Sequence, residues 1–211
     1  MDLSSRREQY ESEGIDAQGL SDDPFDQFEI WYRQAEAADL WDPNACVAAT
    51  VDSDGWPSAR YVLLKAFDLD GFVFFTNYDS YKAAAFATTG RAALTFGWLP
   101  LRRQVRIVGS IEETSAEESD QYFASRPRGS QIAASASPQS REIPDRAHLE
   151  AMVAEARAAS AEADVPRPPY WGGYRVRPHS IEFWQGRPDR LHDRIRYDLN
   201  AGSWSKARLA P

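Results

Sequence analysis

The feature of this sequence that most constrains its fold is a series of short apolar runs broken by tight-turn signals. Runs rich in β-branched and aromatic residues occupy 46–52, 58–67 and 72–76, with Asp54-Gly55 and Asp70-Gly71 between them. Asp-Gly between such runs is typical of two-residue hairpins, so three antiparallel strands are predicted. Further strands are predicted over 92–99, 104–112, 174–176, 181–184, 195–197 and 203–208. Many short strands joined by tight turns predict a small antiparallel barrel, mainly β with peripheral helices.

Helices are expected around this barrel. Asp23 followed by Pro24 is typical of a helix start, and apolar residues then recur at three- and four-residue steps as far as Ala35. The other expected segments are a helix over 80–88 ending at Gly90, a helix over 115–125 begun by a capping box, a loop with a short helix over 129–146, and an amphipathic helix around 149–156. Residues 1–22 are polar and are expected to form a flexible arm, which leaves 23–211 as one domain.

Charge and composition argue against several classes of protein. With 24 Lys and Arg against 32 Asp and Glu, the net charge of −8 opposes non-specific attraction to nucleic acid and to anionic membranes. No apolar run approaches the ~20 residues of a membrane-spanning helix, and the first residues lack the apolar stretch of a signal peptide, so a cytoplasmic location is expected. The single cysteine, Cys46, lies in an apolar run and is interpreted as a buried small side chain. The three histidines have none of the usual ligand spacings, so no metal site is expected.

Cations are nevertheless concentrated in a few stretches. In the predicted strand around 60–65, Arg60 and Lys65 point to opposite faces, which fits either charged heads reaching water at strand ends or groups that bind an anion. At the start of the predicted 80–88 helix, Ser80 and Lys82 fit either an ordinary helix cap or a phosphate site formed with free backbone N–H groups. Neither GxxxxGK[ST] nor GxGxxG occurs, which argues against the standard nucleotide-binding loops.

Two further stretches carry polar groups that converge. Arg126 and Arg128 lie near a predicted helix end, where they either complement the helix dipole or bind a phosphate dianion. After the aromatic strand at 181–184, Arg190, His192 and Arg194 alternate, so in extended backbone they would share one face. A histidine between two cations favours its neutral form. Three polar groups on one face favour a binding site over a purely structural histidine.

In their order along the chain these motifs resemble the pyridoxine/pyridoxamine 5′-phosphate oxidase family. The most specific match is Ile181-Glu182-Phe183-Trp184-Gln185 followed by Arg190-Leu191-His192-Asp193-Arg194. It is accompanied by matches at 60–65, 75–77, 103–105, 125–131, 139–140, 171–173 and 208–211. The resemblance implies an FMN-binding split β-barrel and a homodimer with FMN at the subunit interface. It also implies that pyridoxamine 5′-phosphate or pyridoxine 5′-phosphate is oxidised to pyridoxal 5′-phosphate by O₂, which gives hydrogen peroxide.

The resemblance further implies roles for individual residues. FMN contacts fall on Arg60, Lys65, Phe75, Thr76, Ser80, Lys82, Gln104, Gln139, Ser140, Trp184 and Arg194. Contacts with the substrate phosphate fall on Lys65, Tyr122, Arg126 and Ser130, while Arg190 and His192 lie over the substrate ring as the catalytic residues. The expected mechanism holds the substrate C4′ carbon against flavin N5 for hydride transfer, with Arg190 and His192 orienting the C4′ amine or alcohol.

One position departs from the family pattern. Where the family commonly has Arg or Lys between the residues equivalent to Ser80 and Lys82, this chain has Tyr81. FMN binding is therefore expected to be weakened but not abolished, because one cation at the phosphate is missing. In the N-terminal arm, Arg7 and Tyr10 resemble family residues that cover the active site.

Three alternatives come from other functional classes. A split-barrel reductase that uses a flavin or a deazaflavin would share the barrel, but is not expected to carry both the 190–194 and the 125–127 motifs. A non-catalytic carrier of flavin or pyridoxal phosphate would need neither Arg190 nor His192. A nucleic-acid-binding barrel would need a basic surface with exposed aromatic residues. Peroxide production on addition of pyridoxamine phosphate separates the oxidase from all three.

Overall fold

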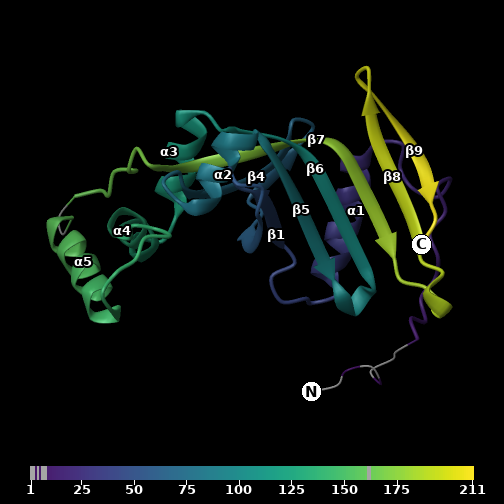
Figure 1. Ribbon diagram of the computed structural model, residues 1–211, viewed down its shortest axis with the longest axis horizontal. Coiled ribbons are helices and arrows are strands. Elements are labelled where there is room, and N and C mark those ends of the chain that lie inside the picture. The colour runs from purple at the N-terminus through teal and green to yellow at the C-terminus, as the bar shows by residue number, and fades with distance from the viewer. Residues whose placement is uncertain (1–2, 4, 6–8, 161–162) are drawn as a thin grey trace.

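The computed structural model describes residues 3, 5, 9–160 and 163–211, and in this part of the chain one curled antiparallel sheet of nine strands organises the fold (Figure 1). The strands are β1 Ala45–Val51, β2 Pro57–Leu63, β3 Ala66–Asp68, β4 Gly71–Asn77, β5 Arg91–Trp98, β6 Arg103–Glu113, β7 Trp171–Gln185, β8 Asp193–Asn200 and β9 Ser203–Leu209. Their order is β2-β1-β5-β6-β7-β4-β3, with β8 paired to β7 and β9 paired to β8. The predicted class, mainly β with peripheral helices, is confirmed.

The helices lie around the sheet and are unevenly distributed. They are α1 Pro24–Ala37, α2 Tyr81–Thr89, α3 Ala116–Ser125, α4 Arg128–Ala136 and α5 Arg146–Ala159, with 3-10 turns at Leu99–Leu101 and Pro188–Arg190. Helices α2 to α5 gather at one end of the molecule and β8 and β9 at the other (Figure 1). Two predicted helix starts are confirmed, since an Asp23 carboxylate oxygen accepts from the Phe25 N–H at 2.7 Å and the Ser115 hydroxyl oxygen accepts from the Glu118 N–H at 3.1 Å.

Strand β7 is longer than the sequence pattern predicted. The expected strands 174–176 and 181–184 are parts of one 15-residue strand, so the prediction of two short strands is wrong. Proline lacks the N–H that a ladder needs, but Pro178 lies where the pairing with β6 shifts register between Val108 and Gly109. Because the ladder is already interrupted at this bulge, the N–H that Pro178 lacks is not needed there, and pairing with β6 continues on both sides of it. A side chain at Gly109 would lie 2.0 Å from the Arg177 carbonyl oxygen, so this close approach requires glycine.

The expected strand 58–67 is also different, because it divides into β2 and β3. At the division the Leu64 N–H donates to the Asn44 carbonyl at 2.9 Å, and the Lys65 N–H donates to the Val73 carbonyl at 2.8 Å. The chain therefore leaves β1 and joins β4, while its alternation of side chains continues. Val62 is buried and Arg60 half-buried, whereas Tyr61 and Leu63 are exposed, so the predicted alternation of faces is confirmed. This crossing places Lys65 at the junction of two parts of the sheet.

The core is an aromatic cluster between α1 and the sheet. Phe28 is fully buried, and its ring lies 4.9 to 5.1 Å from the rings of Phe67, Phe72 and Phe96. Cys46 is buried as predicted, and burial raises the pKa of its thiol to about 12. Among the described residues, no helix is both long and apolar enough to cross a membrane.

Replacing Phe28 by alanine is expected to lower the free energy of unfolding by about 3–5 kcal/mol, because it removes a fully buried ring from several aromatic neighbours. Urea denaturation measures this change. Ile30→Ala is the matched control on the same helix, where the side chain is 45% exposed, and should cost far less. Equal losses at the two positions would contradict the role given to Phe28.

Candidate functional site

Three of the four cation-bearing stretches meet at one pocket of about 500 Å³. It lies where β2, β4, α2, α3 and the start of α4 converge, at the helix-rich end of the sheet. Its lining includes eight of the residues predicted from the sequence, namely Lys65, Phe75, Thr76, Lys82, Tyr122, Arg126, Ser130 and Gln139. These eight residues are far apart in the sequence, and the fold brings them together around one pocket.

Lys82 lines one side of this pocket, while Arg60 and Ser80 do not line it but lie beside Lys82. The Lys82 ammonium donates to Thr76 Oγ1 and Gln139 Oε1, each at 2.8 Å, and to Ser80 Oγ at 3.2 Å. Burial, followed by the positive charge of Arg60, lowers the pKa of Lys82 to about 8. Within the described residues no carboxylate forms an ion pair with Arg60 or with Lys82. We call Arg60, Ser80 and Lys82 the first cationic site.

Arg60 is held in place by neutral groups. One of its terminal nitrogens, Nη1, donates to Thr50 Oγ1 at 2.9 Å and to the Ala48 carbonyl at 3.1 Å, while Nη2 donates to Ser58 Oγ at 2.6 Å. These bonds fix the guanidinium without neutralising its charge. A positive charge that is partly buried and unpaired favours an anionic ligand.

Arg126 forms a second cationic site across the same pocket. Its Nη1 atom is buried and has no hydrogen-bond partner, and its guanidinium lies 4.6 Å from the centre of the Trp171 ring. Burial lowers its pKa. Buried polar atoms without partners are rare in folded proteins because each costs about 1–3 kcal/mol, more when charged. The arrangement suits an anion with oxygens that accept from this nitrogen.

Aromatic rings separate the two cationic sites. Phe75 stacks on Tyr122 with centroids 3.9 Å apart and on Trp171 with centroids 5.6 Å apart, both nearly parallel. Flat aromatic surfaces of this kind suit a planar ring bearing an anionic group. Trp171 was missed as a site residue by the sequence reasoning, although its run 171–173 was one of the motifs.

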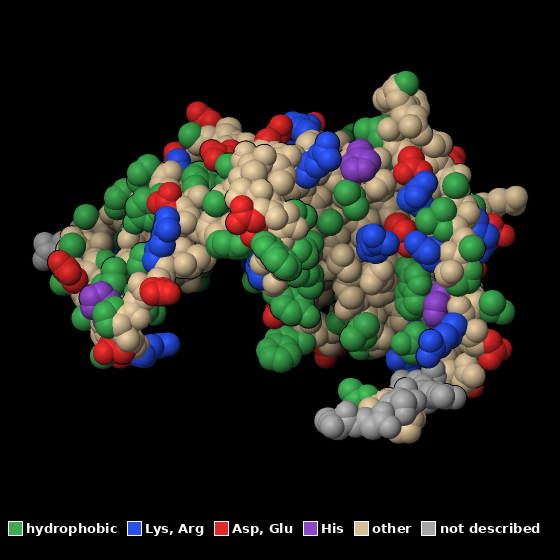
Figure 2. Space-filling view, in the orientation of Figure 1, with side chains coloured by type: hydrophobic (Ala, Val, Ile, Leu, Met, Phe, Trp, Pro, Cys, Tyr) green, Lys and Arg blue, Asp and Glu red, His purple; other side chains and the backbone are tan. Residues whose placement is uncertain are grey.

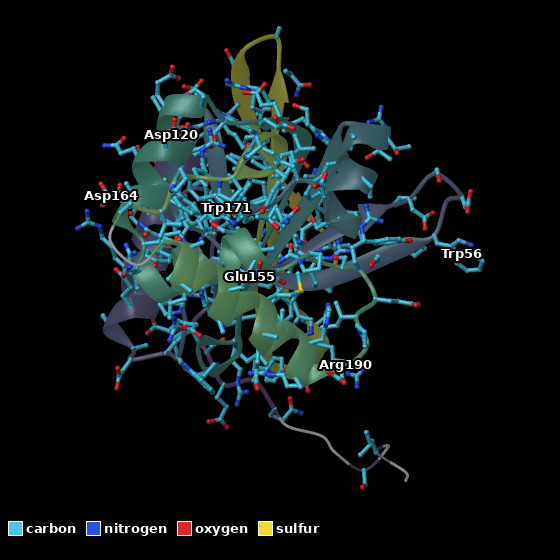
Figure 3. The ribbon with its side chains drawn as sticks, turned by 90° about the vertical axis from the view of Figure 1, so that its left-hand side faces the viewer. Trp56, Asp120, Glu155, Asp164, Trp171 and Arg190 are labelled. Atoms are coloured by element: carbon cyan, nitrogen blue, oxygen red, sulfur yellow. The ribbon has the colours of Figure 1, made fainter. Side chains whose placement is uncertain are left out.

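The remaining predicted residues lie elsewhere. Gln104 pairs with Trp184 across the β6–β7 ladder, and Trp184 pairs with Arg194 across β7–β8. Trp171 and Gln185 are the two ends of β7, so this second group lies up to about 45 Å along the strand from the pocket. Figure 3 shows Trp171 and Arg190 well apart. Ser140 is exposed beside Gln139 and does not line the pocket.

His192 is held in a defined orientation within this second group. Its ring centre lies 4.6 Å from that of Trp184, and the Arg187 N–H donates to its Nδ1 at 3.0 Å. Burial, with a contribution from Arg190, lowers the pKa of His192. The ring is thus favoured in its neutral form with the proton on Nε2, which leaves a hydrogen-bond donor pointing away from the backbone.

The predicted alternation of Arg190, His192 and Arg194 on one extended face is wrong. Asp189 and Arg190 have φ angles of 55° and 62°, and strand β8 begins only at Asp193. The 3-10 turn that starts at Pro188 turns the chain before the strand begins. The Arg194 guanidinium donates to both carboxylate oxygens of Glu182, at 2.8 and 3.1 Å, so it is already neutralised.

Part of the N-terminal segment lies against this second group. The Tyr10 ring is 5.9 Å from that of His192 and 6.3 Å from that of Trp184, and the Arg102 guanidinium lies 4.7 Å from its centre. The Ile15 N–H donates to Asp193 Oδ2 at 3.1 Å. Arg7, which was expected to act with Tyr10, lies outside the described residues.

Comparisons with known proteins agree with these motifs. Residues 33–160 match the family described as pyridoxamine 5′-phosphate oxidase, and residues 171–211 match the pyridoxine 5′-phosphate oxidase C-terminal dimerisation region. Proteins named pyridoxine/pyridoxamine 5′-phosphate oxidase from Burkholderia pseudomallei and Burkholderia vietnamiensis are each 54% identical over 212 residues, which covers 99% of both chains in each case.

Solved structures confirm the split-barrel fold. PhzG from Burkholderia lata, in complex with tetrahydrophenazine-1-carboxylic acid, matches with a TM-score of 0.87 and 33% identity over 92% of this chain and 95% of that chain. A pyridoxamine 5′-phosphate oxidase-related, FMN-binding protein from Nostoc punctiforme matches with a TM-score of 0.73 and 17% identity over 91% of this chain and all of the other. FMN is the cofactor of this group of proteins, and the unpaired cations Arg60 and Lys82 fit its phosphate.

FMN binding is expected to weaken as pH rises through about 8, because Lys82 then loses its proton and its charge. A single proton allows at most about tenfold loss per pH unit. Titrations between about pH 7 and pH 9.5, where the phosphate is already a dianion, measure this effect. Lys82→Arg keeps its charge throughout and should remove the decline. The same decline in Lys82→Arg would assign the effect to another group.

Proposed function

The chain belongs to the pyridoxamine 5′-phosphate oxidase family, and from that premise we propose that it oxidises pyridoxamine 5′-phosphate or pyridoxine 5′-phosphate to pyridoxal 5′-phosphate. O₂ is the electron acceptor. The amine reacts with one O₂ and one water to give the aldehyde, ammonia and hydrogen peroxide, and the alcohol reacts with O₂ to give the aldehyde and peroxide. The observation that carries this proposal is the pair of unpaired cationic sites in one pocket, which suits two phosphate esters.

The first cationic site is assigned to the FMN phosphate. Arg60, Ser80 and Lys82 would hold it, while Thr76 and Gln139, which already bond to Lys82, lie beside it. When bound, FMN accepts the hydride from the substrate and passes its electrons to O₂. The protein's part is to bind the two ligands and to hold them in register.

The second cationic site is assigned to the substrate phosphate. The buried Arg126 Nη1 would gain the acceptor that it lacks, and Lys65, Tyr122 and Ser130 line the same pocket. Binding the phosphate fixes the position of the pyridine ring, so remote binding energy orients the reacting carbon.

Arg190 and His192 are assigned to the C4′ group of the substrate. Neutral His192 offers its Nε2–H as a donor, because its Nδ1 is occupied by the Arg187 N–H. The positive charge of Arg190 disfavours a protonated amine nearby, and only the unprotonated amine releases hydride readily. These two residues thus orient the C4′ amine or alcohol and favour its reactive form.

Two copies of the chain are needed for this assignment. The pocket and the His192 group lie at opposite ends of β7, so a second copy must supply the His192 group to each pocket. The region that matches the dimerisation family, 171–211, contains β7, β8 and β9. Trp56, Tyr61 and Leu63 are exposed on the β1–β2 hairpin, with Trp56 at its projecting tip (Figure 3), and exposed apolar patches of this kind are typical of interfaces. The hollow between the helix-rich end and the sheet leaves room for part of a second copy (Figure 2).

A second candidate substrate is a planar polycyclic carboxylic acid. The 33% identical structure carries tetrahydrophenazine-1-carboxylic acid, and an unpaired guanidinium accepts a carboxylate as readily as a phosphate. The 54% identical relatives favour the phosphate ester. Anaerobic addition of each compound to the FMN-loaded protein distinguishes them, because only a substrate bleaches the flavin absorbance. Peroxide formation after air is admitted then tests the oxidase assignment.

Arg190→Ala and His192→Ala are each expected to lower kcat/KM for pyridoxamine 5′-phosphate by at least about tenfold, or ~1.4 kcal/mol of transition-state stabilisation. FMN should stay bound, because neither residue is assigned to the cofactor. Steady-state peroxide assays and the flavin content of the purified variants measure the two effects. Full activity in either variant removes the proposed role.

Mixing two variants of strongly reduced activity tests the shared site. Arg126→Ala damages the pocket and His192→Ala damages the group supplied by the other copy. Exchange of subunits gives about half mixed dimers, each with one intact site, so about a quarter of the wild-type activity should return. No recovery after verified exchange would mean that each chain completes its own site.

A further inference from the structure

Tyr81 and Asp52 join the first turn of α2 to the β1–β2 hairpin. The Tyr81 hydroxyl donates to Asp52 Oδ2 at 2.6 Å. The other carboxylate oxygen, Oδ1, accepts from the N–H groups of Asp54 and Trp56, at 3.0 and 2.8 Å. These bonds, with that of Tyr81 the largest, lower the pKa of Asp52. The carboxylate is therefore charged at neutral pH and is held on both oxygens, by the hairpin at Oδ1 and by α2 at Oδ2.

Asp52 is also close to the first cationic site. It lies two residues after Thr50 and just beyond the end of β1, where its N–H donates to the Trp56 carbonyl at 3.0 Å and so continues the hairpin pairing. With extended backbone at this point, the two side chains project from the same face about 7 Å apart. Thr50 is a direct partner of the Arg60 guanidinium. Arg60 in turn lies near enough to the Tyr81 hydroxyl for its charge to lower the pKa of that hydroxyl, against the larger raising effect of Asp52. The same hydroxyl thus has a carboxylate as its partner and a guanidinium as its neighbour.

Arg60 has no carboxylate partner among the described residues, although Asp52 lies only one same-face position beyond its partner Thr50. A free carboxylate at that distance would pair with the guanidinium and would also repel a bound phosphate. Both oxygens of the Asp52 carboxylate are instead occupied by the Tyr81 hydroxyl and by the two backbone N–H groups of the hairpin.

We propose that Tyr81 is a positioning residue for the FMN phosphate site, whose hydroxyl holds the Asp52 carboxylate on the hairpin and so keeps it from pairing with Arg60. The inference rests on the proposed assignment of Arg60 to that phosphate. The inference gives Tyr81 a role in FMN binding although its side chain carries no charge. An arginine at this position would face the same carboxylate, and its charge would be divided between Asp52 and the phosphate.

The test is a double-mutant cycle read by FMN affinity. The dissociation constant of FMN for the full-length protein is measured by quenching of flavin fluorescence at low ionic strength. Tyr81→Phe removes only the hydroxyl and is expected to weaken FMN binding about two- to fivefold, the range of an exposed polar pair. Asp52→Asn should bind FMN at least as tightly as the wild type. The double variant Tyr81→Phe/Asp52→Asn should match Asp52→Asn, because no charged carboxylate remains to be held.

Asp54→Asn provides the matched control, since it removes an equal charge from the same turn without removing the partner of Tyr81. Tyr81→Phe should still weaken binding in that background. The proposal is overturned if Tyr81→Phe binds FMN as the wild type does, even with a lowered Tm, or if the weakening persists when Asp52 is asparagine. Arg60→Ala tests the assignment of Arg60 to the FMN phosphate separately from the role of Tyr81. Unchanged FMN affinity in that variant would reject Arg60 as a phosphate ligand.

Discussion

The ladder between β6 and β7 is the interaction on which the rest of the structure depends. It runs from the pair Arg103–Gln185 to the pair Glu113–Tyr174, and β7 also pairs with β4 along its first half and with β8 along its second. One strand therefore fixes the distance between the pocket at its start and the His192 group near its end. Because a paired strand cannot fold back on itself, a single chain cannot bring the two groups together. The second copy that the proposed shared site calls for follows from this rigidity.

Two kinds of arginine can be distinguished by their partners. Arg194 and Arg175 are paired with carboxylates, Arg194 with Glu182 and Arg175 with Asp68 and Glu118. Arg126 lines the pocket and Arg60 lies beside Lys82, which also lines it, and these two arginines are held only by neutral groups or by an aromatic ring. Pairing stabilises the sheet, whereas leaving a cation unpaired costs stability and favours a ligand. In an acidic protein this difference concentrates positive potential at the few places where a cation has no carboxylate partner.

Sequence patterns predicted those parts of the fold that local chemistry controls. The caps at Asp23 and Ser115 depend on neighbouring residues alone, and the alternation of faces around Arg60 depends on the two-residue period of a strand. The change of partner strand at Leu64 and the continuity of β7 through Pro178 depend on strands distant in sequence, so alternation could not reveal them. The motifs identified the pocket residues correctly as neighbours. The partner of Tyr81 lies 29 residues away on a hairpin, and no local pattern indicated it.

The unsatisfied Arg126 nitrogen and the low pKa of Lys82 also make the stability of the folded state depend on the concentration of its ligands. A protein that leaves charges unpaired is less stable empty than loaded, and any ligand that binds only the folded chain shifts the unfolding equilibrium in proportion to its free concentration. At one hundred times the dissociation constant this shift is about 2.7 kcal/mol. In a cell that degrades unfolded chains, the amount of this protein would therefore follow the availability of its cofactor without any dedicated sensor.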